Sequence, residues 1–225
     1  MDATEFRAFS DRRAAGRALA RQVAARFAEL DTAGRPLVLA LPRGGLPIGQ
    51  EVAARINGEL DIIVARKVGL PEQPELGVGA VTADGPPLFN RTLLDEVGLT
   101  EADLAPAVER EREEARRRLR RYRAGRQPPE IRDRTVIVTD DGLATGVTAM
   151  AALREVRSKG PRHLWFAAPV CARDATQLLL TAADTVLCVH MPERFTAVGA
   201  WYHDFAQLSD EDVEAALASE GVRDG

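Results

Sequence analysis

A regular alternation of apolar strands and helices runs through the chain from residue 134 onward. Strands are expected at 135–139, 164–170 and 185–189, with helices at 148–157 and 173–181 between them. Such alternation places successive strands parallel and connects them by right-handed crossovers. The sequence therefore predicts an α/β protein built on an open parallel sheet flanked by helices.

The N-terminal part contributes further elements of the same kind. Short apolar runs bounded by prolines or glycines are typical of strands buried on both faces. The expected elements are a helix at 11–30 capped by Ser10 or Asp11, a strand at 36–42, a helix at 48–56 and a second strand at 61–65. Together these segments predict about five parallel strands in a single domain spanning residues 1–225.

Three other segments fall outside this alternation. A hairpin or two short strands are expected over 75–81 and 86–89, and a last helix over 209–218, capped by Ser209. A charged helical insertion is expected over 100–124, and residues 109–126 carry nine Arg and four Glu. This arginine-rich segment has two interpretations, a solvated helix face or a basic surface directed at an anion or a partner.

Composition excludes several classes of protein. The 30 Lys and Arg against 34 Asp and Glu give a net charge of −4, so the overall charge does not point to nucleic acid as a partner. No apolar run is long enough to span a membrane, and the first residues do not resemble a signal peptide. Cys171 and Cys188 are too few for a disulfide framework. A cytoplasmic protein with buried thiols is expected.

The segment 136–148 carries the clearest chemical pattern. A buried strand ends in Asp140 and Asp141, a loop of small and hydroxyl residues follows, and a helix then begins. Ligands of open parallel sheets bind at the carboxyl ends of the strands, and such a loop presents N–H groups to an anion. The pattern predicts a phosphate site beside carboxylates that bind hydroxyls or Mg²⁺. The alternative interpretation, a strand–turn–helix corner with capping aspartates, would explain only part of the residue pattern in 136–148.

Segment 136–148 resembles the signature of type I phosphoribosyltransferases, in which apolar residues precede two acids and a loop of small and hydroxyl residues. Gly142 departs from this signature, because an aliphatic residue is commoner there. The resemblance implies that Asp140 and Asp141 hold ribose hydroxyls, directly or through Mg²⁺. It also implies that the 5-phosphate is bound by Ala144, Thr145, Gly146, Val147 and Thr148.

A second loop, Leu41-Pro42-Arg43-Gly44-Gly45, resembles the pyrophosphate loop of the same family. Glycines let the backbone approach a polyanion closely, and a cation balances its charge. The resemblance implies that Arg43, Gly44 and Gly45 bind pyrophosphate and that a cis peptide lies at this turn. Lys67, which follows Arg66 at the end of the second strand, is either a further pyrophosphate ligand or part of a solvated strand end.

Residues 191–208 resemble the hood segment that binds the base in purine phosphoribosyltransferases. The resemblance implies that Phe195 stacks on the base and that Thr196 and Val198 contact its edge. Asp204 matches the family's acidic residue, a candidate metal ligand with Asp140 and Asp141. The remaining aromatic side chains, those of Trp201, Tyr202 and Phe205, are expected to pack in a small satellite core.

The family resemblance implies a function. A phosphoribosyltransferase with Mg²⁺ would transfer 5-phosphoribose from 5-phospho-α-D-ribose 1-diphosphate to an aromatic or heterocyclic nitrogenous acceptor and release pyrophosphate. It would be a homodimer with a small hood. One alternative is a weakly catalytic regulator of this fold that binds nucleotide or RNA. The other, a receiver-type signalling domain, places its acidic pair after the first strand instead.

Two further features bear on the acceptor and on catalysis. Phosphoribosyltransferases for 6-oxopurines carry an Asp three residues after the second acid, where this chain has Ala144 and adenine enzymes also carry Ala. The resemblance therefore implies that hypoxanthine and guanine are poor substrates. No chemistry can be assigned to Glu75, and His163, His190 and His203 lack the spacing of metal ligands.

Overall fold

The computed structural model describes residues 8–31, 34–70 and 77–221, with side chains up to residue 218. Its main sheet has five parallel strands in the order β2-β1-β6-β7-β8. The strands are β1 (Leu37–Ala40), β2 (Glu59–Ile62), β6 (Thr135–Thr139), β7 (His163–Val170) and β8 (Thr185–His190). The predicted open parallel sheet is confirmed.

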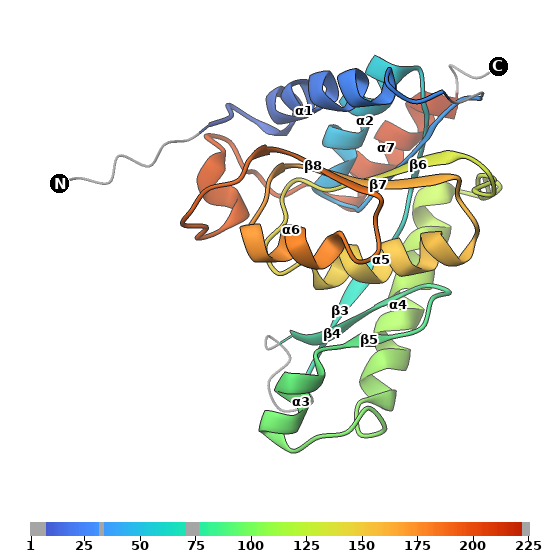
Figure 1. Cartoon of the computed structure of the whole chain (residues 1–225). Coiled ribbons are helices and arrows are strands. Elements are labelled where there is room, and N and C mark those ends of the chain that lie inside the picture. Colours follow the sequence, from blue (N-terminus) through green and yellow to red (C-terminus); the bar gives the residue numbers. More distant parts are fainter. Residues whose placement is uncertain (1–7, 32–33, 71–76, 222–225) are drawn as a thin grey trace.

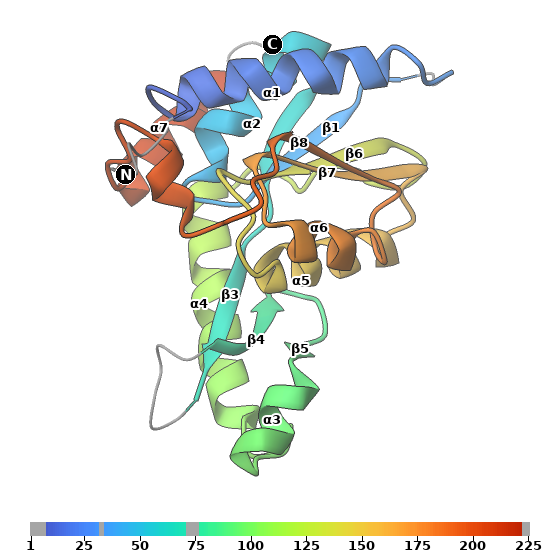
Figure 2. The same ribbon diagram turned by 60° about the vertical axis from the view of Figure 1, so that its left-hand side comes forward.

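Helices cover both faces of this sheet (Figures 1 and 2). One face packs against α1 (Arg12–Phe27), α2 (Gly45–Ile56) and α7 (Asp210–Gly221), and the other against α5 (Val147–Ser158) and α6 (Arg173–Leu179). Every residue of β1 and β6 is buried, as expected for strands covered on both faces. This double coverage explains why β1 is apolar throughout and why β6 has an apolar centre between Thr135 and Thr139.

A small antiparallel sheet lies beside the main sheet and corrects one sequence expectation. It consists of β3 (Ala65–Gly69), β4 (Gly77–Thr82) and β5 (Leu88–Phe89). The second parallel strand was expected to run through residue 65 and end at Arg66 and Lys67. Instead β2 ends at Ile62, and Arg66 and Lys67 lie inside β3. An unbroken apolar run does not show where a strand changes pairing partner.

Two helices complete this smaller part of the molecule (Figure 1). The short helix α3 (Arg91–Val97) was not expected, and α4 (Ala105–Arg123) begins five residues later than the predicted helical insertion. The expected hairpin is confirmed by the antiparallel pairing of β4 with β5. Glu75, to which no role was assigned, lies outside the described residues. The hood segment contains one 3-10 turn, η1 (Val198–Trp201).

The arginines of α4 fasten this helix to the rest of the protein. Arg112 donates to the carbonyl of Gly85 at 2.7 Å, and Arg116 donates to the carbonyl of Ala83 at 3.1 Å. Arg123 forms an ion pair with the buried carboxylate of Asp61 at 3.0 Å. One side of the helix is therefore attached to the rest of the protein, whereas Arg117 and Arg120 are exposed elsewhere on its surface.

No helix in the described ranges is both long enough and apolar enough to cross a membrane.

Candidate active site

The two loops that the sequence singled out meet at the carboxyl edge of the main sheet. They follow β1 and β6, which are neighbouring strands. A Cβ added to Gly44 would lie 2.5 Å from Cγ of Asp141, and one added to Gly45 would lie 2.6 Å from the carbonyl oxygen of Thr139. Only glycine permits this close approach. The Pro42–Arg43 peptide is cis, as the family resemblance implied.

Asp140 and Asp141 form a half-buried acidic pair at this edge. The backbone N–H of Asp141 donates to Oδ1 of Asp140 at 2.8 Å, which fixes the first carboxylate in the loop. Burial, and then the neighbouring charge of Asp141, raise the pKa of Asp140 well above its usual range. Burial also raises the pKa of Asp141, and the guanidinium of Arg12 opposes that rise. A cation or hydroxyl donors at this point would offset the cost of both charges.

Arg12 at the start of α1 supplies such a cation. Its Nε donates to Oδ2 of Asp141 at 2.8 Å, and its Nη1 donates to the carbonyl of Ala206 at 2.8 Å. The guanidinium carbon lies 3.9 Å from the ring centroid of Phe205, a cation–π arrangement. Sequence reasoning missed Arg12, because 129 positions separate it from Asp141 and no local pattern marks it.

The loop expected to bind phosphate leads directly into α5. Gly146 is the N-cap residue of α5, and no side chain caps this helix end by a hydrogen bond. Ala144 and Thr145 are exposed, whereas Val147 and Thr148 are half-buried. The first N–H groups of the helix and the hydroxyls of Thr145 and Thr148 can therefore donate hydrogen bonds to a phosphate.

The hood segment packs directly on the acidic loop. A Cβ added to Gly142 would lie 2.7 Å from Cγ2 of Val198, which explains why the aliphatic residue common at this position is missing here. Tyr202 donates its hydroxyl to the carbonyl of Asp141 at 2.6 Å. Half-buried Phe195 and exposed Thr196 lie between β8 and η1, in the same segment. The structure thus brings the hood and the acidic loop together.

The expected satellite core of aromatic side chains is only partly present. Tyr202 is 2% exposed and packs against Phe9, with ring centroids 5.6 Å apart. Trp201 is half-buried and stacks on the ring of His190. Phe205 corrects the expectation, because it is 37% exposed and lies under the Arg12 guanidinium. Its ring also contacts that of Tyr202, with ring centroids 5.1 Å apart.

The three carboxylates proposed as metal ligands do not form a cluster. Asp204 is exposed and accepts a hydrogen bond from the backbone N–H of Ala206 at 2.9 Å. Within the described part of the chain, no group of three or more His, Cys, Asp or Glu side chains could hold a metal ion. The pair Asp140 and Asp141 alone suits Mg²⁺, which proteins often bind through one or two carboxylates and the phosphates of a substrate.

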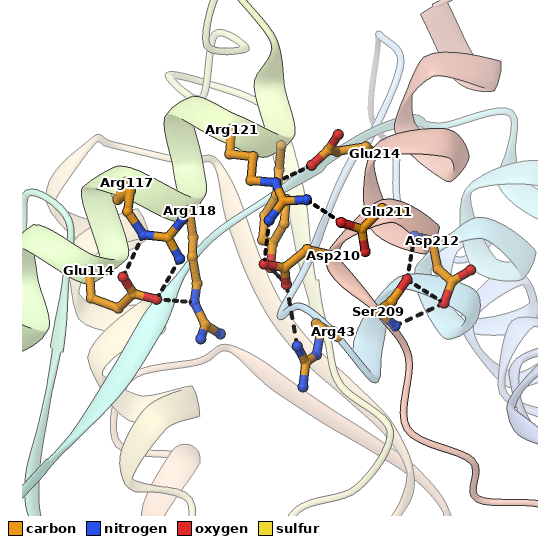
Figure 3. A network of polar contacts seen from close by, with 11 residues as sticks. Arg43, Glu114, Arg117, Arg118, Arg121, Ser209, Asp210, Glu211, Asp212 and Glu214 are labelled. Carbon is orange, nitrogen blue, oxygen red and sulfur yellow. Dashed lines mark hydrogen bonds and ion pairs between the residues drawn. The ribbon is translucent and has the colours of Figure 1, made fainter.

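The cations assigned to pyrophosphate lie in different surroundings. Arg43 is half-buried, and its Nη1 donates to Oδ1 of Asp210 on α7 at 3.3 Å (Figure 3). Lys67 is exposed and lies opposite Ala80 in the small sheet, so it is not at the end of β2 where it was expected. Arg66 forms an ion pair with Glu111 of α4 at 3.0 Å. Arg43 is thus the cation carried by the loop that touches the acidic pair.

Comparisons with known proteins agree with this geometry. A crystal structure of TT1426 from Thermus thermophilus is 40% identical, covers 94% of this chain and 98% of that chain, and has a TM-score of 0.77. The structure of the AQ2163 protein from Aquifex aeolicus shares the fold at 13% identity, with 84% of this chain and 78% of that chain covered and a TM-score of 0.50.

Curated sequences and a family model point the same way. The chain is 38% identical over 209 residues to "Putative phosphoribosyl transferase MT0597" of Mycobacterium tuberculosis, a match that covers 93% of this chain. It spans 46% of that relative's length, about half. The family model described as "Phosphoribosyl transferase domain" matches residues 8–202, which include both site loops and most of the hood. The chain therefore belongs to the phosphoribosyl transferase domain family.

Proposed function

We propose that the protein transfers the 5-phosphoribosyl group of 5-phospho-α-D-ribose 1-diphosphate to a nitrogenous heterocyclic acceptor. The observation that carries this proposal is the contact between the loop at Gly44 and the carboxylate of Asp141. It brings an arginine-bearing glycine turn, an acidic pair and an uncapped helix N-terminus to one edge of the sheet. In the donor, the diphosphate would bind the arginine-bearing turn, the ribose hydroxyls would bind the acidic pair, and the 5-phosphate would bind the helix N-terminus.

The proposed reaction is a displacement at C1 of the ribose. A ring nitrogen of the acceptor forms a bond to C1, and the bond from C1 to the diphosphate oxygen breaks, with its electron pair leaving on pyrophosphate. The transition state has oxocarbenium character, as in other glycosyl transfers. The protein contributes by holding the donor in place, offsetting the charge of the leaving group and excluding water.

Each site residue has a defined task in this proposal. Asp140 and Asp141 orient the ribose hydroxyls, and the N–H groups and hydroxyls of residues 144–148 hold the 5-phosphate. Arg43 offsets the negative charge that grows on the leaving pyrophosphate. Mg²⁺, held by Asp140 and Asp141, would supply further positive charge to the diphosphate when bound.

The acceptor site is proposed to lie under the hood. Phe195 stacks on the acceptor ring, and backbone groups near Thr196 and Val198 contact its edge. Val198 already touches the acidic loop through Gly142, so an acceptor held there would lie close to the ribose site. Ala144 has no group that can exchange a proton with a ring nitrogen.

Calorimetric titration with the donor and Mg²⁺ tests this function. The wild type should bind the donor, and only weakly without Mg²⁺. A variant carrying both Asp140→Asn and Asp141→Asn should fold but lose donor binding, since each carboxylate–hydroxyl bond contributes ~1.5–3 kcal/mol. Asp174→Asn, on an exposed position of α6, is the matched control and should bind normally. Unchanged donor affinity in the folded double variant would contradict the assigned site.

Assays with a panel of bases complete the test. Turnover of at least one heterocycle supports the transferase. Absence of turnover with every base, combined with RNA binding that weakens steeply as salt increases, would favour the regulator instead. The contacts of α4 with the carbonyls of Ala83 and Gly85 do not favour that alternative, because they engage arginines that RNA would need.

A further inference from the structure

A carboxylate from the last helix lies against the loop proposed to bind pyrophosphate. Asp210, at the start of α7, accepts hydrogen bonds from the Tyr122 hydroxyl at 2.6 Å, from Arg121 Nη1 at 2.9 Å and from Arg43 Nη1 at 3.3 Å (Figure 3). Its side chain is 15% exposed. A single oxyanion is thus surrounded by donors from the Pro42–Gly45 loop and from α4.

Helix α7 is held in this place by its other acidic residues. Besides Asp210, Arg121 pairs with Glu211 at 2.7 Å and with Glu214. Ser209 and Asp212 close the first turn, because the Asp212 carboxylate accepts from the Ser209 N–H at 2.8 Å and the Ser209 hydroxyl accepts from the Asp212 N–H. Arg121 therefore docks α7 on α4, and this docking places Asp210 against Arg43.

A further arginine faces the same space. Arg118 of α4 pairs with Glu114 at 2.7 Å and is 22% exposed. Figure 3 shows the guanidinium groups of Arg118 and Arg43 pointing to the same side of Asp210. The neighbouring Arg117 pairs with the same Glu114 but is 51% exposed. The two adjacent arginines thus share a partner and differ in burial.

The chemistry of this arrangement is that of an anion site. Guanidinium groups and a hydroxyl around one carboxylate provide the charge-assisted hydrogen bonds that also hold a phosphoryl group. Arg43 is engaged by Asp210 only at 3.3 Å, the longest of the three contacts, so a stronger anion can replace this partner. A diphosphate carries more negative charge than one carboxylate.

We propose that Arg118 is a second diphosphate-binding residue and that Asp210 is a built-in competitor, which occupies Arg43 until a diphosphate displaces it. This inference rests on the proposed function, because it takes the Pro42–Gly45 loop as the diphosphate loop. The proposal gives the arginine-rich helix α4 a part in ligand binding, in addition to the contacts with Ala83 and Gly85 that hold it in place.

Calorimetric titration of the full-length protein with pyrophosphate and Mg²⁺ tests the proposal through two matched pairs of variants. Arg118→Ala should weaken binding about tenfold, as expected for loss of one charge-assisted contact, whereas Arg117→Ala should bind as the wild type does. Asp210→Asn should tighten binding about tenfold, whereas Asp212→Asn should leave it unchanged. If Asp210→Asn does not fold, Asp210→Ser, which also removes the negative charge and keeps an oxygen that can accept from Tyr122, should tighten binding in its place.

The outcomes separate this proposal from the proposed function. Equal pyrophosphate affinity in Arg117→Ala and Arg118→Ala, or no gain in either Asp210→Asn or Asp210→Ser, overturns the inference while donor turnover still stands. The expected pattern with pyrophosphate, in a protein that neither binds nor turns over the donor, supports the anion site and overturns the transferase. Absence of pyrophosphate binding in every variant overturns the inference.

Discussion

Arg12 donates a hydrogen bond from Nε to Oδ2 of Asp141 at 2.8 Å, so the first helix of the chain reaches the acidic pair that follows β6. Both side chains are largely buried, with 12% of Arg12 and 15% of Asp141 exposed. Removal of one partner from a buried pair leaves the other charge without compensation. The contact is therefore expected to matter for stability as well as for the site.

Arg12→Ala should lower the free energy of unfolding by ~1–3 kcal/mol, because it leaves the Asp141 carboxylate with an unsatisfied charge. Urea denaturation at neutral pH measures this loss. Arg13→Ala is the matched control, since Arg13 is 61% exposed and its ion pair with Glu51 is long, at 3.5 Å. A loss of equal size in both variants would show that the Asp141 contact contributes nothing special.

Arg43→Ala should weaken pyrophosphate binding far more than binding of ribose 5-phosphate. The Arg43 side chain belongs to the proposed diphosphate loop, and residues 144–148 are proposed to hold the 5-phosphate. A half-buried, charge-assisted contact contributes more than an exposed one. Parallel calorimetric titrations with the two ligands provide the measurement, and an equal loss for both would place the effect of Arg43 in the fold.

Gly142→Ala should destabilise the protein by ~1–3 kcal/mol, the usual range for overpacking. The added Cβ would lie 2.7 Å from Cγ2 of Val198. Val198→Ala removes this methyl group, so the double variant should recover much of the stability that Gly142→Ala loses. Thermal unfolding of the four proteins in this cycle gives the interaction energy. Additive losses in the double variant would mean that Val198 does not limit position 142.

Ionisation of the two tyrosines should appear only at high pH. Burial, and then the hydrogen bond to Asp210, raise the pKa of Tyr122 to about 12 from its ordinary 10.0, and burial also raises the pKa of Tyr202. Near pH 10 the folded protein therefore binds more protons than the unfolded chain. Its free energy of unfolding should fall as pH rises from about 10 to about 12.

The tyrosinate absorbance band checks this expectation directly. At pH 10 the urea-unfolded protein should show both tyrosines half ionised, and the folded protein should show almost no signal. Asp210→Asn should lower the pKa of Tyr122, since it removes the neighbouring negative charge. A folded protein that titrates like the unfolded chain would contradict the burial of both hydroxyls.

Hypoxanthine and guanine should be poor acceptors, because Ala144 stands where 6-oxopurine enzymes carry an acid. Loss of one positioned acid or base typically costs ~10²–10⁴ in rate. Steady-state assays with hypoxanthine, guanine, adenine, orotate and uracil measure the preference. A kcat/KM for either 6-oxopurine within the ~10⁴–10⁸ M⁻¹s⁻¹ range of physiological substrates would show that position 144 does not set the acceptor preference.

Local sequence patterns predicted the strand that leads into the candidate site and the edge of the sheet at which the site loops lie. The strand at 135–139 has the bounds expected from its apolar run, and the acidic pair follows it as expected. The Gly44 and Asp141 loops meet because parallel neighbouring strands end at one edge of a sheet. The change from β2 to β3 could not be predicted, because no residue in that run breaks the strand pattern.

The parts of the site that depend on the ends of the chain were beyond sequence reasoning. Arg12 and Asp141 are 129 positions apart, and Arg43 and Asp210 are 167 positions apart. Neither pair belongs to a sequence motif or has a spacing that indicates contact, because tertiary packing alone brings these residues together. From the sequence, Asp210 is only acidic charge in the first turn of a helix, a local role that it also fulfils.

The close approach of Gly44 to Asp141 limits how this site can be re-engineered. A side chain at position 44 would overlap the carboxyl group of Asp141, so positions 44 and 141 cannot be redesigned separately. A library that diversifies the glycine turn to admit a different leaving group would have to vary the acidic loop in the same clones. Single substitutions at position 44 should displace the Asp141 carboxylate, which also holds Arg12, whatever leaving group they were meant to accept.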